Sequence, residues 1–240
     1  MLEGINIFLP TRKRPDRLRK FLSSMKETAD DVGRLHVVFV VDIGDVDTVT
    51  AIESECDDLV SYQIIWNLET KAPHLAYFYN RCYAETEHWQ DNWAVSMFGD
   101  DMVFVSQGWD TAFLAALNED EGVAIVYGDD DYIQHEKMCV HLVTSRKLVR
   151  ATRHEFMAPF AADMIDTVWK QVGQMCGLLR YLPDVHIRHE HNGQLKPEHR
   201  DSTWTRLQTV KLPQAAGYKR VEGVANEIAK TLKEVGYARR

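Results

Sequence analysis

Acidic side chains gather in short runs that each follow an apolar stretch of the sequence. The runs are Asp42 with Asp45, Asp100-Asp101, and Asp129-Asp130-Asp131. Crowded carboxylates repel one another unless a cation lies between them. Their oxygens suit hard ions such as Mg²⁺ or Mn²⁺, which often complete their coordination with water and substrate phosphates. The runs therefore indicate a divalent-metal site for a phosphate-bearing substrate, although an acidic doublet can equally be a turn or a helix cap.

Histidines are densest late in the chain, at His186, His189, His191 and His199. On a strand, His189 and His191 would point to one face. Such a pair suits a metal site or a contact to diphosphate. A zinc site built from histidines and acids is one alternative, and a solvated surface histidine is the other.

A basic patch precedes all of these groups in an otherwise acidic protein. It comprises Arg12, Lys13, Arg14, Arg17, Arg19 and Lys20. Arg12 or Arg14 could pair with a phosphate. Arg17, Arg19 and Lys20 fit better on the solvated face of a helix that begins at Pro15, a favoured first position for proline.

The elements that must position these residues can be read from the apolar pattern. We expect strands over residues 5–9, 36–41, 62–66, 93–98 and 123–127, with helices from residue 15 and over 46–55 and 73–85. The less regular second half predicts a strand near 137–143, a helix over 163–176, a short strand or loop over 183–191, and a C-terminal helix. Alternating strands and helices predict an α/β fold with a mainly parallel sheet covered on both faces. Ligands of such sheets bind at the carboxyl ends of the strands, where the acidic runs fall.

The bulk properties exclude several classes of protein. The net charge of −8 argues against strong sequence-independent binding to nucleic acid. No apolar run approaches the ~20 residues that span a bilayer, and four scattered cysteines suit reduced thiols. We therefore expect a cytoplasmic protein without membrane contact. The sequence has no P-loop, dinucleotide-binding glycine motif or nucleophile elbow.

Several segments resemble GT-A-fold glycosyltransferases of family 2 type, especially small glycosyltransferase-like proteins of bacteria and their phages. The matching segments are Leu9 to Leu18, Val40 to Asp45, Phe98 to Val103, Gly108-Trp109-Asp110 and His189-Glu190-His191. Phe98 to Val103 is similar to the family's metal-binding DxD region. A strict DxD has acids two positions apart, whereas Gly99 and Met102 flank the doublet here.

The resemblance implies a GT-A-like αβα sandwich and a role for each matching residue. The nucleotide-sugar pocket would be lined by Pro10, Thr11, Arg12, Arg14, Asp42, Asp45 and Asp100. Asp101 would bind Mn²⁺ or Mg²⁺, together with His189 or His191. Asp163 or Asp166 would act as general base on the acceptor hydroxyl, unless Asp163 only caps its helix and Asp166 is solvated.

The resulting prediction is a metal-dependent glycosyltransferase, hexosyl or pentosyl, that uses a nucleotide-sugar donor. Candidate acceptors are a small molecule, a glycan or a phage-modified DNA base, and a phage-encoded chain would work in the host cytoplasm. The alternatives are a nucleotidyltransferase and a non-catalytic nucleotide- or sugar-binding module. We expect a catalytic domain over residues 1–195 and a C-terminal helical extension over 196–240, packed on or near it.

Overall fold

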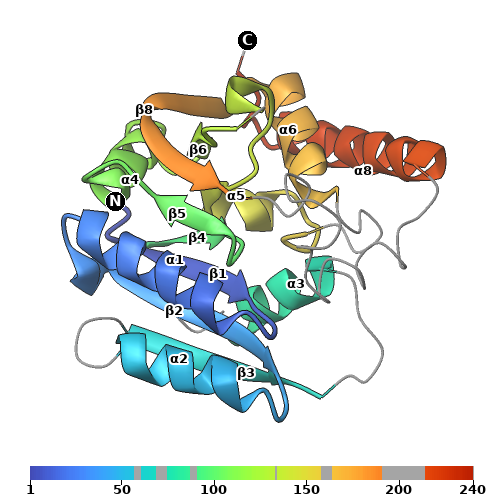
Figure 1. Cartoon of the computed structure of the whole chain (residues 1–240). Coiled ribbons are helices and arrows are strands. Elements are labelled where there is room, and N and C mark those ends of the chain that lie inside the picture. Colours follow the sequence, from blue (N-terminus) through green and yellow to red (C-terminus); the bar gives the residue numbers. More distant parts are fainter. Residues whose placement is uncertain are drawn as a thin grey trace.

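The fold is described from a computed structural model of the chain (Figure 1). The structure describes residues 1–56, 61–68, 75–86, 91–132, 134–157, 164–190 and 214–239. Asp163, His191 and His199 lie outside these ranges, as do the start of the helix expected over 73–85 and the boundary expected at residues 195–196.

The N-terminal half alternates strands and helices as the sequence predicts. Its elements are β1 (Gly4–Pro10), α1 (Pro15–Thr28), a 3-10 turn η1 (Val32–Arg34), β2 (Leu35–Asp42), α2 (Val46–Cys56), β3 (Ser61–Asn67), α3 (Leu75–Glu85) and β4 (Trp93–Met97). Strands β1 and β2 are buried along nearly their whole length, which explains their continuous apolar runs. Helix α1 has Pro15 in its first turn and buries Leu18, Phe21, Leu22 and Met25.

The second half contains more helices than expected, two strands of only three residues and one longer strand. Its elements are β5 (Met102–Phe104), α4 (Trp109–Glu119), β6 (Ile125–Asp129), a 3-10 turn η2 (His135–Lys137), β7 (Val143–Ser145), α5 (Arg146–Ala151), α6 (Ile165–Cys176), β8 (Leu179–His189) and α8 (Gln214–Glu234). The strand expected over 137–143 is wrong, because η2 and an irregular segment occupy most of that range. The sequence reading also missed α4, which buries Trp109, Phe113 and Leu117 at a spacing of four.

The eight strands form one mixed sheet in the order β3-β2-β1-β4-β7-β6-β8-β5. Strands β3, β2, β1 and β4 run parallel. Strand β7 is antiparallel to both β4 and β6, so β6 points the same way as β4. Strand β8 is parallel to β6, and β5 is antiparallel to β8. The carboxyl ends of β1, β2, β4, β6 and β8 therefore share one edge of the sheet, which we call the carboxyl edge.

Two hydrophobic cores cover the two faces of this sheet. One core packs strand residues such as Phe8 and Val40 against α3, α5, α6 and α8. The other packs Ile7 and Phe39 against α1, α2 and α4. This three-layer arrangement confirms the predicted αβα sandwich (Figure 1).

Helix α8 and the C-terminal segment join the body of the fold. Val221, Ala225, Ile228 and Leu232 of α8 belong to the core that also holds α6. Beyond the helix, the guanidinium of Arg239 pairs with Asp120, and its backbone N–H donates to the carbonyl of Cys176 (2.8 Å). Over the described part of the chain, no helix has an apolar stretch long enough to cross a bilayer.

Strand β8 carries an irregularity beside the carboxyl edge. Leu182 pairs with Gly128, but the next residue of β6, Asp129, pairs with His186, so residues 183–185 bulge out of the ladder. A Cβ on Gly128 would lie 2.2 Å from the carbonyl oxygen of Val185. Only glycine fits this close approach of the two backbones.

Candidate functional site

The loop between β1 and α1 is tied to Asp100 at the carboxyl edge. Thr11 donates its hydroxyl to Asp100 Oδ2, and Arg14 Nη1 donates to Oδ1, both at 2.8 Å. Asp100 is buried, and burial raises its pKa while Arg14 lowers it. Both of its oxygens are therefore engaged by protein groups, and the predicted contact between Asp100 and a donor stays a prediction.

Two further acids hold the same loop. Arg12 Nε lies 2.6 Å from Asp42 Oδ2, and Asn67 donates to Asp42 Oδ1 (2.6 Å). The backbone N–H of Lys13 donates to Asp45 Oδ2 (2.7 Å). Lys13 has φ of +50°, an uncommon conformation for a non-glycine residue that these contacts hold in place.

Asp101 faces away from this loop, toward the end of β8. Its Oδ1 lies 3.4 Å from His189 Nε2, and its Oδ2 lies 3.9 Å from Arg17 Nη1. The backbone N–H of Glu190 donates to the Asp101 carbonyl (2.7 Å). Burial raises the pKa of Asp101, but the hydrogen bond and charge of His189 and the charges of Arg14 and Arg17 together outweigh burial, so the pKa lies below its ordinary value.

The charges of three acids from three different elements act on His189. Burial lowers the pKa of His189, but Asp101, Asp130 and Asp166 together raise it above its ordinary value. The His189 N–H also donates to the Asp130 carbonyl (2.9 Å). Acids after β4 and β6 and at the start of α6 therefore all influence the histidine at the end of β8.

The Asp166 carboxyl has the character of a base poised near neutral pH. Burial raises its pKa to about 6. Its Oδ1 accepts the backbone N–H of Thr167 (2.7 Å) and lies 3.3 Å from the Thr167 hydroxyl, and both contacts lower the pKa. A carboxyl that is ionised at pH 7 yet close to its pKa can accept a proton from a substrate.

Tyr79 holds the backbone just ahead of the acidic doublet. This tyrosine of α3 is buried, and its hydroxyl donates to the carbonyl of Phe98 (2.6 Å), just ahead of Gly99-Asp100-Asp101. Burial raises the pKa of Tyr79 well above its ordinary value, and Asp101, Asp100 and Asp166 raise it further. Tyr79 therefore lies close to the predicted catalytic and metal-binding acids.

The third acidic run is largely occupied in shaping its own loop. Asp130 accepts the backbone N–H groups of Tyr132, Gln134 and His135. Asp129 accepts the Tyr181 hydroxyl and His135 Nδ1 (2.9 Å). Two groups in this region could supply metal ligands, Asp129-Asp130-His135 and Asp129-Asp131-His186, and within each group the ligand atoms lie within 4.8 Å of one another.

Basic groups beside the acids change the sequence argument for a metal. The sequence argument for a metal assumed that the carboxylates repel one another because they have no cationic partners. In the structure, Asp42 pairs with Arg12, Asp100 with Arg14, and Asp101 with His189. Relief of repulsion therefore does not call for an ion here. The possible donor sets that remain are Asp101 with His189 and the two groups around Asp129.

Most predicted site residues meet at the carboxyl edge, and several others were missed. Pro10 ends β1 there. Arg17 was expected on a solvated face, but it is close to Asp101. Asn67 and Tyr79 were not predicted at all, since their roles depend on pairing between distant segments. The roles assigned to the predicted residues stay predictions.

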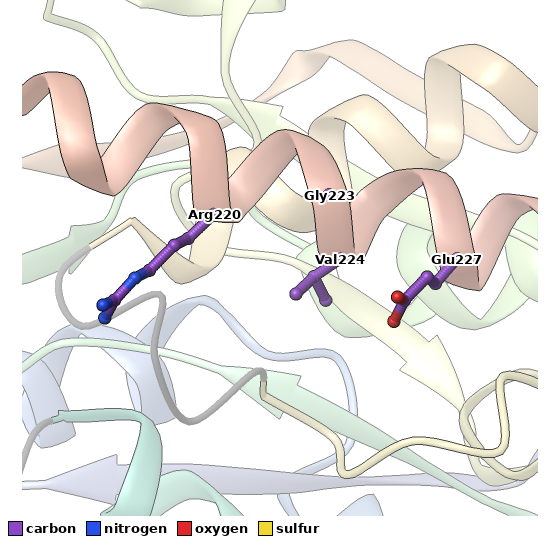
Figure 2. A pocket seen from close by; sticks show the side chains of 4 residues that line it. All are labelled: Arg220, Gly223, Val224 and Glu227. Atoms are coloured by element: carbon purple, nitrogen blue, oxygen red, sulfur yellow. The ribbon is translucent and has the colours of Figure 1, made fainter.

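A separate hollow of about 350 Å³ lies along α8 (Figure 2). Arg220, Gly223, Val224 and Glu227 line it, and the three side chains extend toward the same side of the helix. All four lining residues belong to α8, so no other described element contributes a wall that would define a ligand.

Comparison with known proteins identifies the fold. Neither the protein-family models nor the curated protein sequences match this chain. Among solved structures, the chain is similar to the mannosyltransferase PcManGT from Pyrobaculum calidifontis in complex with GDP-Man and Mn²⁺. The TM-score is 0.59 and the identity 14%, over 100% of this chain and 77% of that chain.

A second set of similar structures comes from S. aureus TarS. The match to TarS 1-349 has a TM-score of 0.63 at 11% identity and covers 94% of this chain and 81% of that chain. One such structure is in complex with UDP-GlcNAc, with a TM-score of 0.60. These likenesses confirm the GT-A-like fold that the sequence resemblance implied.

Proposed function

We propose that this chain is a glycosyltransferase that moves a sugar from a nucleotide-sugar donor to an acceptor hydroxyl. The observation that carries the proposal is the pairing of Asp101 with His189 at the carboxyl edge of a GT-A-like sheet, where the charge of Asp166 also acts on His189. Ligands of open α/β sheets bind at this edge. Similar folds in PcManGT and TarS, solved with GDP-Man and with UDP-GlcNAc, support a nucleotide-sugar donor.

The donor side of the proposed site is the loop between β1 and α1. Thr11, Arg12 and Arg14 are held by Asp100 and Asp42 rather than by solvent, so the loop is in place before a ligand arrives. A preorganised loop lowers the entropic cost of binding. Pro10 and Asp45 complete the predicted nucleotide pocket.

The donor set suits a divalent ion such as Mn²⁺ or Mg²⁺. Asp101 Oδ1 and His189 Nε2 are 3.4 Å apart, close to the roughly 3 Å that separates neighbouring ligands at Mg²⁺–ligand distances of about 2.1 Å. When bound, such an ion supplies Lewis-acid neutralisation of the diphosphate leaving group. PcManGT, with a similar fold, was solved with Mn²⁺.

Asp166 is the proposed general base. With a pKa of about 6 it is ionised at neutral pH and can take the proton of the acceptor hydroxyl. The Thr167 N–H fixes one of its carboxylate oxygens. Asp163 remains the other candidate for this role from the sequence.

The test starts from donor binding. Thermal unfolding of the protein is measured with GDP-mannose, UDP-GlcNAc and related nucleotide sugars, each with and without Mn²⁺. A ligand that binds only the folded state raises the unfolding temperature. We expect at least one donor to do so, and more strongly with Mn²⁺.

Product analysis then separates the candidate activities. From these donors a glycosyltransferase releases a nucleoside diphosphate and transfers the sugar. Release of pyrophosphate from an added nucleoside triphosphate would indicate a nucleotidyltransferase, and tight binding without turnover would indicate a binding module. Either result would contradict the proposal. Supplying hexosyl and pentosyl donors with small-molecule, glycan and modified-DNA acceptors defines the reaction further.

A further inference from the structure

Three basic side chains gather beside the proposed metal site, where α1 passes the end of β8. They are Arg17, Lys20 and Arg188, which we call the basic rim. Lys20 Nζ pairs with the carboxylate of Glu190, and Arg188 Nη2 lies 3.5 Å from the same oxygen. Arg17 Nη1 donates to the Glu190 carbonyl (3.4 Å). Two elements far apart in the sequence thus place their cations around one residue.

Within the described part of the chain, Lys20 and Arg188 place two cations against the single carboxylate of Glu190, which leaves an excess of positive charge. The three cations of the rim face Glu190 and, through Arg17, also Asp101 at 3.9 Å. The whole chain has a net charge of −8, and the neighbouring strand ends are acidic. A local excess of positive charge in such a protein attracts anions to this point of the carboxyl edge.

The rim is accessible to a ligand. The side chains of Lys20 and Arg188 are 49% and 47% exposed, and that of Arg17 is 25% exposed. Exposed ion pairs contribute little to the stability of a fold. Exchange of Glu190 for a better anion therefore costs little, because the rim does not hold the fold together.

We propose that the basic rim is a binding subsite for a phosphate group next to Asp101. Arginine and lysine are the usual partners of phosphate, and charge-assisted hydrogen bonds are among the strong ones. The phosphate belongs either to the donor diphosphate or to a phosphate-bearing acceptor, and this choice rests on the proposed function. The intramolecular carboxylate of Glu190 occupies the subsite until the phosphate binds.

The experiment measures binding of inorganic pyrophosphate by calorimetry at two salt concentrations. The rim variant is Lys20→Gln with Arg188→Gln, which leaves Arg17 and its contact to Asp101 intact. The matched control is Arg19→Gln with Arg34→Gln, because these arginines are similarly exposed (42% and 46%) and pair only with acids on the protein surface. Both double variants change the net charge by the same amount.

We expect the rim variant to bind pyrophosphate at least roughly tenfold more weakly than the control, since hydrogen bonds to charged groups are the stronger kind. Glu190→Gln should have the opposite effect and tighten binding several-fold, because it removes the competing carboxylate. Equal pyrophosphate binding by the rim and control variants would overturn the proposal.

Kinetics identify the source of the phosphate. A higher KM for the nucleotide sugar in the rim variant assigns the subsite to the donor, and a higher KM only for a phosphate-bearing acceptor assigns it to the acceptor. Failure of the proposed function has a different signature: the native protein would transfer no sugar, while its pyrophosphate binding would still depend on the rim.

Discussion

The two halves of the carboxyl edge use their carboxylates differently. Around β1 and β2, the acids Asp42, Asp45 and Asp100 bind side chains or backbone of the loop that follows β1. Across the sheet, Asp101 faces His189, and Asp166 has a pKa raised to about 6 by burial. The first group fixes a loop, and the second has the chemistry for metal binding and proton transfer.

The comparison shows that an acidic run at a strand end can contain both kinds of residue. Asp100 and Asp101 are adjacent, yet Asp100 belongs to the first group and Asp101 to the second. Substitutions in the two groups should therefore fail in different ways. The second group should lose turnover while the fold remains, and the first should lose stability.

The largest effect is expected for Asp101→Ala. Loss of this carboxylate should reduce sugar transfer by about a thousandfold or more, since Lewis-acid stabilisation contributes several kcal/mol and each 1.36 kcal/mol is a factor of ten. Turnover is measured at saturating Mn²⁺, with circular dichroism to confirm the fold. Native-like turnover would show that Asp101 does not bind a catalytic metal and belongs with the acids of purely structural role.

Asp166→Asn should lower kcat roughly 10²- to 10⁴-fold, the usual contribution of a general base. In the native protein the base is protonated below its pKa, so kcat/KM should fall about tenfold per pH unit below about pH 6 and level off above it. The pH profile of the variant should lack this step. A variant that keeps the step would show that another group, such as Asp163, is the base.

Arg14→Met tests the loop-fixing group through stability. It leaves the buried Asp100 without its cation, which typically costs about 3–5 kcal/mol. Urea unfolding gives the change, and Arg19→Met on the exposed face of α1 is the control, with an expected change within about 0.5 kcal/mol. Equal losses in the two variants would mean that Asp100 does not anchor this loop.

Tyr79→Phe should have the smallest effect, and it should lower both stability and turnover. It leaves the buried Phe98 carbonyl without its donor, at a cost of about 1–3 kcal/mol in stability. Because that carbonyl precedes the doublet, turnover should also fall. In the control, Tyr127→Phe, the lost hydroxyl instead donates to the Glu136 carbonyl (2.8 Å) and accepts from Lys170 Nζ (3.0 Å), and stability should fall without loss of turnover. Unchanged turnover in both variants would separate Tyr79 from the site.

The sequence predicted those parts of the molecule that depend on local pattern. The strands and helices up to β4 have continuous apolar runs or a single apolar face, and the acidic runs mark the strand ends. The same local evidence could not show that Arg17 contacts Asp101, or that the two oxygens of Asp100 are taken by Thr11 and Arg14. Those contacts arise from pairing between segments about 85 residues apart.

The second half was harder to predict because its strands are short or irregular. Strand β7 has three residues, too few for a periodic signal. Strand β8 contains Pro183 and exposed polar residues, so its pattern resembles a loop. Its pairing with β6 and β5 makes it a strand, and this tertiary contact overrides the local preference.

The bulge in β8 sets which side chains the end of that strand presents to each face. Successive residues of a strand alternate between faces, and the three residues between Leu182 and His186 are an odd number. Leu182 and Ile187 consequently pack into the same core although their spacing is odd. Insertion of one residue into this bulge would shift the alternation by one place, like a frameshift, and would exchange His189 for Arg188 beside Asp101. Loop length at this one point therefore decides whether the site is offered an imidazole or a guanidinium, with no change of residue type.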